Sequence, residues 1–296
     1  AGSRQPVAGR VAMTHDALER AVADRWPDRT QIARDRVRMV SEVTCDRSVL
    51  VELCRLLFAT PDMNFAGIVV EEGSTDWSVR YAFYGVAPDG WVHVVVRAPL
   101  DDRTFPSIVE VTHAANWHER EAEDLYGIVF EGHPHLGDFI LHDDAWQEGV
   151  EPMRRGFSAH TPISVRQPNT EWRPARILQE PGAFVMPIVS IVGGGTDASH
   201  FLLETVGEDV VRAIPRLFYN YRGIEKLAEG QAADDVLLLA ERFSATTAFA
   251  HALGYCRAIE GLDGADVPPR ATILRTFVAE RERFRHHVGA IEGICE

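Results

Sequence analysis

The chain has 296 residues, 46% hydrophobic and 25% charged, a composition typical of folded globular domains and not of disordered or fibrous chains. Its length predicts two domains. The formal net charge of −14 at pH 7 argues against a nucleic-acid partner, because binding to a phosphate backbone requires clustered lysine and arginine side chains.

The N-terminal part alternates between helical and strand-like patterns. Thr14 or Asp16 can cap a first helix, residues 37–43 alternate like a strand, and Asp46 stands where the cap of a second helix belongs. Helices on one side and antiparallel strands on the other predict an α+β fold, a two-layer α/β sandwich. Further strand-like runs follow at 66–70, 77–87 and 91–97, and the pattern over 108–125 predicts one or two helices.

The pattern dissolves after about residue 143, where prolines and scattered polar residues predict an extended connector that lies against a surface. A second unit begins near Pro181, with two strand-like runs around a glycine-rich loop. A helical pattern follows over 234–259. The last pattern opens at Pro268-Pro269 and is expected to bury Ile273, Phe277, Phe284, Val288 and Ile291.

These patterns predict four segments along the chain. The last of them is mostly helical, with a small β-hairpin, and has the character of an incomplete domain. The segments are an N-terminal arm or helix at 1–29, the α+β domain at 30–143, the connector at 144–180 and the helical domain at 181–296.

The sequence lacks the usual signals of metal binding and of membrane insertion. The four cysteines form no Cys-x-x-Cys motif, so we expect free thiols in a reducing cytosol. His133, His135 and His142 could ligate a metal, but no carboxylate-rich ligand set accompanies them. The longest apolar run, 183–192, is far shorter than the roughly 20 residues that a bilayer requires.

The charged run from His118 to Asp124 is the strongest candidate for function. A salt-bridged surface helix, an acid–base or metal site, and a docking surface are the alternatives. Flanking aromatic and apolar residues would hold this helix rigidly against the core, which favours a docking face for a partner protein. The residues expected to dock are Trp117, Glu119, Arg120, Glu121, Asp124 and His133.

Here the sequence resembles a known family. The segments Ala114–Glu121, Asp124–Ile128 and Phe130–Leu136 are similar to the C-type subunit of respiratory complex I, the NADH:quinone oxidoreductases, with a resemblance that runs from about residue 36 to 143. The second unit resembles the start of the D-type subunit of complex I and of [NiFe]-hydrogenase large subunits. A fusion of the two is the arrangement of the formate hydrogenlyase large subunit. The motifs in the second unit are Arg216–Tyr219, Arg222–Leu227, Ala240–Arg242, Phe249–His251 and Glu280–His287.

The departures from the family imply a lost metal centre. In the hydrogenases a Cys-x-x-Cys holds nickel and iron, whereas Ser244 and Thr247 occupy those positions here, and a neutral hydroxyl is a poor substitute for a thiolate. We therefore expect no metal and no cofactor bound by this chain. Val192 stands where the family has a polar histidine, with Gly193–Gly195 at the mouth of its cavity.

The resemblance implies a subunit of a membrane-associated oxidoreductase, inactive as an isolated chain. It would lie on the cytoplasmic face as scaffold and cavity wall beside an iron–sulfur small subunit and other peripheral-arm subunits. Iron–sulfur clusters would belong to those partners, and NAD or quinone to the complex. Glu225, Glu241 and His251 would be the catalytic residues, although Glu225 could simply stabilise a helix start. The alternative is a redox-inactive assembly or regulatory subunit.

Overall fold

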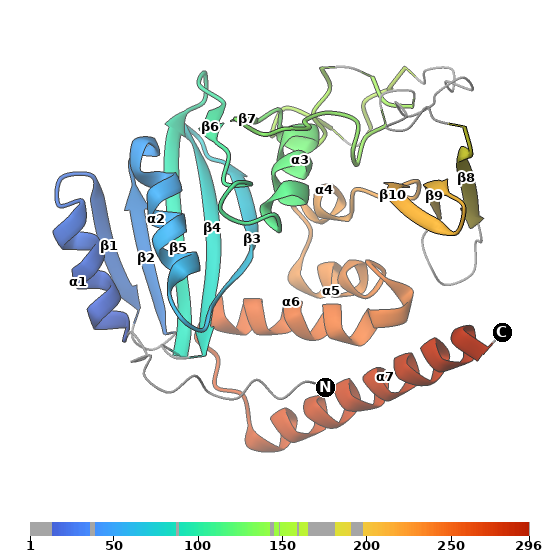
Figure 1. Cartoon of the computed structure of the whole chain (residues 1–296). Helices are drawn as coiled ribbons and strands as arrows, with labels where there is room; N and C mark the ends of the chain where they lie inside the picture. Colours follow the sequence, from blue (N-terminus) through green and yellow to red (C-terminus); the bar gives the residue numbers. More distant parts are fainter. Residues whose placement is uncertain are drawn as a thin grey trace. The chain divides into compact units, whose positions relative to one another are not determined.

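The computed structural model describes residues 14–35, 39–86, 89–142, 145–147, 149–158, 160–164, 181–190 and 198–295. The chain divides into two compact units, Ala1–Thr170 (unit 1) and Glu171–Glu296 (unit 2) (Figure 1). Some predictions lie outside the described residues. They concern most of the N-terminal arm (1–13), part of the connector (165–180), and the glycine-rich loop with Val192 (191–197).

Unit 1 is built on a five-stranded sheet in the order β1-β2-β5-β4-β3 (Figure 1). Neighbouring strands are antiparallel except β2 and β5, which run parallel after the chain has passed through a helix and two further strands. The strands are β1 (Thr30–Asp35), β2 (Val40–Cys45), β3 (Met63–Glu72), β4 (Asp76–Val86) and β5 (Asp89–Pro99).

Two capped helices, α1 (His15–Arg25) and α2 (Arg47–Ala59), belong to this sheet. The hydroxyl of Thr14, and not Asp16, accepts a hydrogen bond from the Ala17 amide. The Asp46 carboxylate accepts one from the Ser48 amide at 2.8 Å, as the sequence predicted. These bonds satisfy amides that lack partners at a helix start.

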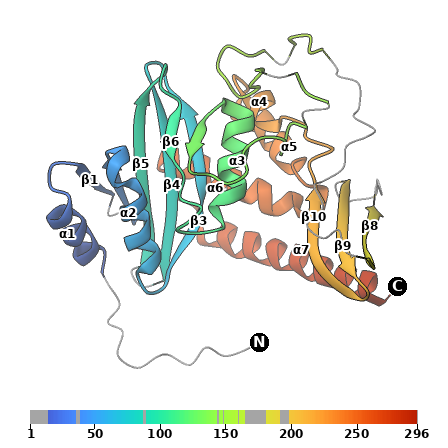
Figure 2. The same cartoon turned by 45° about the horizontal axis from the view of Figure 1, so that its top comes forward.

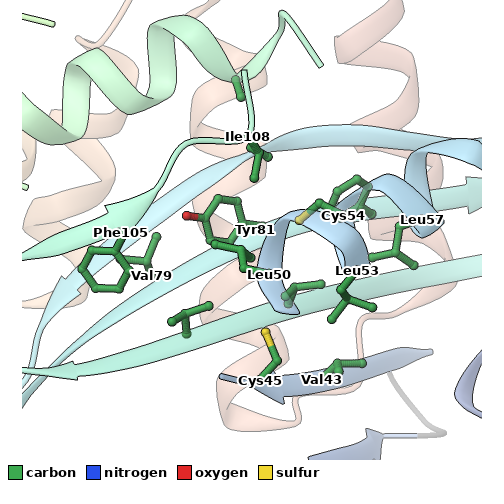
Figure 3. Packing of buried hydrophobic residues seen from close by; sticks show 14 of the residues in the cluster. Val43, Cys45, Leu50, Leu53, Cys54, Leu57, Val79, Tyr81, Phe105 and Ile108 are labelled. Atoms are coloured by element: carbon green, nitrogen blue, oxygen red, sulfur yellow. The ribbon is translucent and has the colours of Figure 1, made fainter. Parts of the chain in front are cut away.

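The core of unit 1 lies between α2 and the sheet (Figure 3). The helix presents an apolar stripe at intervals of three or four residues, and β4 presents every second side chain to the same layer. The predicted α+β sandwich is therefore confirmed. The buried side chains include Leu50, Leu53, Leu57, Trp77, Val79, Tyr81 and Phe83.

Helix α3 (Ala115–Tyr126) follows the sheet and is flanked by two short parallel strands, β6 (Thr104–Pro106) and β7 (Val129–Glu131). It ends at Gly127, whose φ of 70° lies in the left-handed region that favours glycine. A Cβ atom there would lie 2.6 Å from the nearest Arg103 guanidinium nitrogen, so a side chain at this position would also displace the end of that arginine.

The first part of the predicted connector lies against the sheet of unit 1. The Arg154 side chain donates from Nε to a carboxylate oxygen of Glu72 at 3.0 Å, and its guanidinium stacks 4.9 Å from the Trp77 ring centroid. The Arg155 amide donates to the other Glu72 oxygen at 2.7 Å. This confirms, for these residues, that the connector lies against a surface.

Unit 2 begins with a three-stranded antiparallel sheet in the order β10-β9-β8, whose strands run side by side in Figure 2. The sequence predicted only the first two strands, and the third is a difference. Helices follow, as predicted. The elements are β8 (Ala183–Ser190), β9 (Ser199–Val206), β10 (Asp209–Arg216), α4 (Ile224–Ala228), α5 (Ala233–Glu241), η1 (Ala245–Thr247), α6 (Ala248–Asp263) and α7 (Pro269–Cys295).

The helix predicted over 234–259 is broken between α5 and α6. Hydroxyl side chains occupy the break, where the Ser244 and Thr246 hydroxyl oxygens lie 3.3 Å apart, and such side chains disfavour helix interiors by competing for backbone bonds. The Phe243 carbonyl freed by the break accepts a hydrogen bond from Arg222 at 2.7 Å.

Helix α7 forms as predicted, but the prediction that it buries its apolar residues is wrong for this chain. Ile273, Phe277, Phe284, Val288 and Ile291 are all exposed. The period of a helix fixes which side is apolar, whereas burial also requires a neighbouring layer. Within the described residues, no helix combines the length and the apolar character needed to cross a bilayer.

Candidate functional site

The charged side chains of α3 do not all point in the same direction. The Glu119 side chain points into the core of unit 1 and is 0% exposed. One carboxylate oxygen accepts from the Ser107 hydroxyl at 2.6 Å and the other from the Ile108 amide at 2.8 Å. Burial raises the pKa of Glu119 to about 7, against the opposing effect of these two hydrogen bonds.

The placement of Glu119 corrects the expected docking face, because a fully buried carboxylate offers no surface to a partner. Position 119 lies on the same side of the helix as Ala115 and Ala122, which are also buried. An alanine four residues before Glu119 and another three residues after it form the sequence signal that could have predicted its burial.

Arg120 and Asp124 hold the loop that follows β7. Arg120 donates to the carbonyl oxygens of Gly137 and Asp138, at 3.2 Å each. Asp124 accepts, on one oxygen, from the amides of three successive residues, 139 to 141, at 3.2, 2.6 and 3.0 Å. These charges therefore fix a loop to a helix, which is a structural task and not an acid–base one.

Burial changes the pKa of several groups in this region. It raises the pKa of the Asp124 and Glu123 carboxyls despite their hydrogen bonds to backbone amides, and it lowers the pKa of the Arg120 guanidinium. The pKa of the His133 imidazole is also lowered, again chiefly by burial. The polar interactions of α3 are thus formed largely out of water, where hydrogen bonds are stronger.

Trp117 is the most exposed large side chain of α3, at 48% of its surface. Its ring centroid lies 5.6 Å from that of Phe139, and the Arg120 guanidinium stacks on Phe139 at 4.3 Å from the ring centroid. The exposed indole is therefore held in place by a ring that is itself fixed to the helix. Glu121 is also partly exposed and lies 4.0 Å from His118.

The residues predicted to be catalytic lie on three different helices of unit 2. Glu225 is in the first turn of α4 and Glu241 is the last residue of α5, and neither side chain is buried. His251 lies in the first turn of α6, half-buried, with its ring 5.0 Å from that of Phe243. The described contacts do not join these three side chains.

Thr247, one of the two hydroxyl residues discussed above, precedes α6. It lines a pocket of about 400 Å³ between the start of α6 and α7. The Glu282 carboxylate from α7 accepts from the amides of Phe249 and Ala250, at 2.8 and 3.0 Å, and so caps α6. The other residues of the pocket are Ala250, Ala279, Arg283, His286, His287 and Ala290.

Across the described part of the chain, no group of three or more histidine, cysteine or acidic residues is arranged to hold a metal ion. All four cysteines are free. Cys45 and Cys54 are buried in unit 1, Cys256 is half-buried and Cys295 is exposed. The histidines at 133, 135 and 142 therefore form no such group.

Comparison with known proteins identifies the region of α3. Residues 43–162 match the family described as respiratory-chain NADH dehydrogenase, 30 Kd subunit. Hydrogenase-4 component G of Escherichia coli is 32% identical over 211 residues, covering 70% of this chain and 38% of that protein. Formate hydrogenlyase subunit 5 of the same organism is 32% identical over 205 residues, covering 67% and 35%.

The C/D subunit of the NADH-quinone oxidoreductase of Methylococcus capsulatus is 26% identical over 297 residues, which cover 90% of this chain and 50% of that protein. The chain spans half or less of the length of these three relatives. The expected resemblance to the C-type subunit is confirmed for the segment that holds β2 to β5, α2 and α3. Residues 43–162 are thus similar to the 30 kDa subunit of respiratory-chain NADH dehydrogenase.

Proposed function

We propose that this chain is a subunit of a membrane-associated, multisubunit oxidoreductase, in which it forms scaffold and cavity wall beside an iron–sulfur small subunit. The observation that carries the proposal is the exposed Trp117, packed beside Phe139 in a segment similar to the 30 kDa subunit. The identities of the relatives, a hydrogenase component and subunits of formate hydrogenlyase and NADH-quinone oxidoreductase, support it.

In this proposal unit 2 corresponds to the start of a D-type subunit or hydrogenase large subunit. The match that extends over 90% of the chain to a fused C/D subunit supports the correspondence. The complex would lie on the cytoplasmic face of the membrane, attached through its other subunits. Clusters, and any NAD or quinone, would be bound by the complex and not by this chain.

The docking face of the proposal consists of Trp117, Arg120, Glu121 and His133. An exposed tryptophan offers a large apolar surface with few rotatable bonds, and such residues often dominate the binding energy of an interface. Asp124 contributes indirectly, because it fixes the loop that carries Phe139. Glu119 is omitted, since its carboxylate is buried.

The chemistry of the complex is proposed to be other than [NiFe] hydrogen chemistry. Ser244 and Thr247 have hydroxyl side chains in place of thiols, and both residues lie at the break before α6. Glu225, Glu241 and His251 remain the proposed cavity residues for a quinone-type reaction. For hydrogen chemistry, hydroxyls in place of thiolates would favour the second candidate, a redox-inactive assembly or regulatory subunit that retains only its docking face, while quinone chemistry stays open.

The proposal is tested by purifying the tagged chain from membranes of its native host and identifying the iron–sulfur subunit by mass spectrometry. Trp117→Ala is expected to reduce its recovery at least about tenfold, as a hot-spot loss would. Trp91→Ala is the matched control, because that indole is 42% exposed and also lies 5.6 Å from an aromatic ring, that of Tyr84. Equal recovery from the two variants would refute the docking face.

Two further measurements on the purified complex separate the candidate functions. Stoichiometric nickel would contradict the loss of a [NiFe] centre. Quinone reduction that falls in Glu225→Gln would support a cavity role for that carboxylate, whereas a complex without any redox turnover would favour the assembly or regulatory subunit.

A further inference from the structure

The core of unit 1 contains protonatable side chains that the docking face does not use. The Glu119 carboxyl, the Tyr81 phenol and the Cys54 thiol are 0% exposed, and the Cys45 thiol is 6% exposed. They come from α3, β4, α2 and β2, and Figure 3 shows the last three among the leucines of the core. Ionisable groups are costly in such surroundings, because burial disfavours their charged forms.

The hydrogen bonds of Glu119 can be kept in two protonation states. The Ser107 hydroxyl lies 2.6 Å from one oxygen and donates to it when the carboxyl is charged. A hydroxyl both donates and accepts, so Ser107 can accept from the neutral acid, as it already accepts from the Val109 amide at 3.2 Å. The Ile108 amide donates to the other oxygen in either state.

The surroundings of Glu119 favour the neutral acid. The groups that face it are the Cys54 thiol and the Tyr81 phenol, with the Cys45 thiol beside them, and in the described part of the chain the Tyr81 oxygen has no hydrogen-bond partner. The other strands that contact α3 are β3 and β7, and their buried residues are apolar or glycine. No cation contributes to its environment among the described residues.

Through Ser107 and Ile108, Glu119 anchors the segment that leads into α3. Ser107 is joined to β7 by its amide, 2.9 Å from the Glu131 carbonyl, and residues 108–112 form a turn closed on the Ile108 carbonyl. The helix itself begins at Ala115, and its N-cap residue, Ala114, provides no side-chain hydrogen bond. The carboxyl is thus the side-chain contact that ties this entry segment to the helix.

We propose that Glu119 is an internal proton-binding site, and that release of its proton to solvent loosens the segment 107–112 and the start of α3. The neutral acid suits the apolar core, whereas the carboxylate places an uncompensated charge there. Any effect of this proton on the binding of a partner rests on the proposed function, whereas proton binding by Glu119 does not.

The proton would be exchanged near neutral pH, because burial places the pKa of Glu119 at about 7. The carboxyl is therefore neutral in mildly acidic solution and charged in mildly alkaline solution. A change of about one pH unit on either side of neutrality is enough to change its dominant form.

The test measures the chain alone, so that its failure is distinct from a failure to bind partners. Amide hydrogen exchange of residues 107–112 is followed from pH 5.5 to 8 in the full chain and corrected for the intrinsic exchange rate. Protection is expected to fall about tenfold over this range in the wild type, since each pKa unit of coupling is a factor of ten. In Glu119→Gln the profile is expected to be flat.

Glu110→Gln provides the matched control, because Glu110 is an exposed glutamate of the same segment, and it should retain the wild-type profile. The ¹³C resonance of the Glu119 carboxyl should titrate near pH 7 in the wild type, a measurement that does not depend on the folding of any variant. Titration at the ordinary glutamate value, or the same exchange profile in wild type and Glu119→Gln, would overturn the proposal.

Discussion

Unit 1 buries a hydrophobic core, whereas the apolar side chains of the longest helix of unit 2 are largely exposed. Leu50, Leu53 and Phe83 of unit 1 are 0% exposed, while Phe277 and Phe284 of α7 are 64% and 71% exposed. Both regions have the apolar spacing of amphipathic helices. The difference shows that such spacing determines the orientation of a helix, and that burial depends on the layer laid against it.

The largest expected effect is the difference between a core substitution in unit 1 and a substitution of an exposed residue in unit 2. Leu53→Ala should reduce the free energy of unfolding of unit 1 by about 2–5 kcal/mol, because it leaves a cavity. Phe284→Ala removes a larger side chain from an exposed site and should change the stability of unit 2 by only about 0.5 kcal/mol. Denaturant unfolding of the two variants tests this contrast, which fails if Phe284→Ala costs as much as Leu53→Ala.

The second expected effect concerns pH. The pKa of Glu119 is about 7 in the folded chain against an ordinary value of 4.5, so between these values the folded state binds more protons than the unfolded state. Its contribution to stability is complete below pH 4.5 and is lost as pH rises through 7. The loss amounts to at most about 3 kcal/mol.

Glu119→Gln removes this contribution. The stability of the variant relative to the wild type should therefore increase from about pH 5 to about pH 8, as measured by denaturant unfolding at each pH. Other groups titrate equally in both proteins, so the difference isolates Glu119. A constant difference across the range would contradict the raised pKa.

A third comparison uses two glycines that end helices in the left-handed conformation, one in each unit. Gly127 has φ of 70° and a crowded Cβ position, while Gly264, at the end of α6, has φ of 69° and open space around it. Gly264→Ala should cost about 1 kcal/mol, and Gly127→Ala should cost about 0.5 kcal/mol more because the partly exposed ion pair of Arg103 and Glu151 must move. Thermal unfolding of both variants provides the measurement, and equal losses would argue against crowding at Gly127.

The smallest expected effect comes from Tyr81. Its buried hydroxyl has no hydrogen-bond partner within the described residues, and an unsatisfied polar group in a core is unfavourable. Tyr81→Phe should therefore leave the stability of unit 1 unchanged or raise it by about 1 kcal/mol. A clear destabilisation in denaturant unfolding would mean that the hydroxyl has a partner in solution.

Much of unit 1 could be predicted from its sequence because its signals are local. Asp46 caps α2 as expected, and the strand-like run predicted at 77–87 coincides closely with β4. The rest depended on partners distant in the chain. Glu119 is buried because Ser107 and Ile108, twelve and eleven residues earlier, supply its hydrogen bonds.

Unit 2 was less predictable for the same reason. The apolar spacing over 234–259 continued through the break at Ser244, where three hydroxyl residues within four positions, of a type that disfavours helix interiors, interrupt the helix. The exposure of α7 could not be predicted either, since a sequence pattern contains no information on whether a covering layer is present.

The capping of α6 by Glu282 limits what the neighbouring pocket can accept. The first amides of a helix carry partial positive charge and commonly bind anions. Here a carboxylate from α7 already takes that position. The pocket beside Thr247 is lined by this carboxylate together with the Arg283 guanidinium, two histidines and three alanines. The anion position at the start of α6 is thus filled from within the chain, and the guanidinium is the charge that the pocket still offers to a guest.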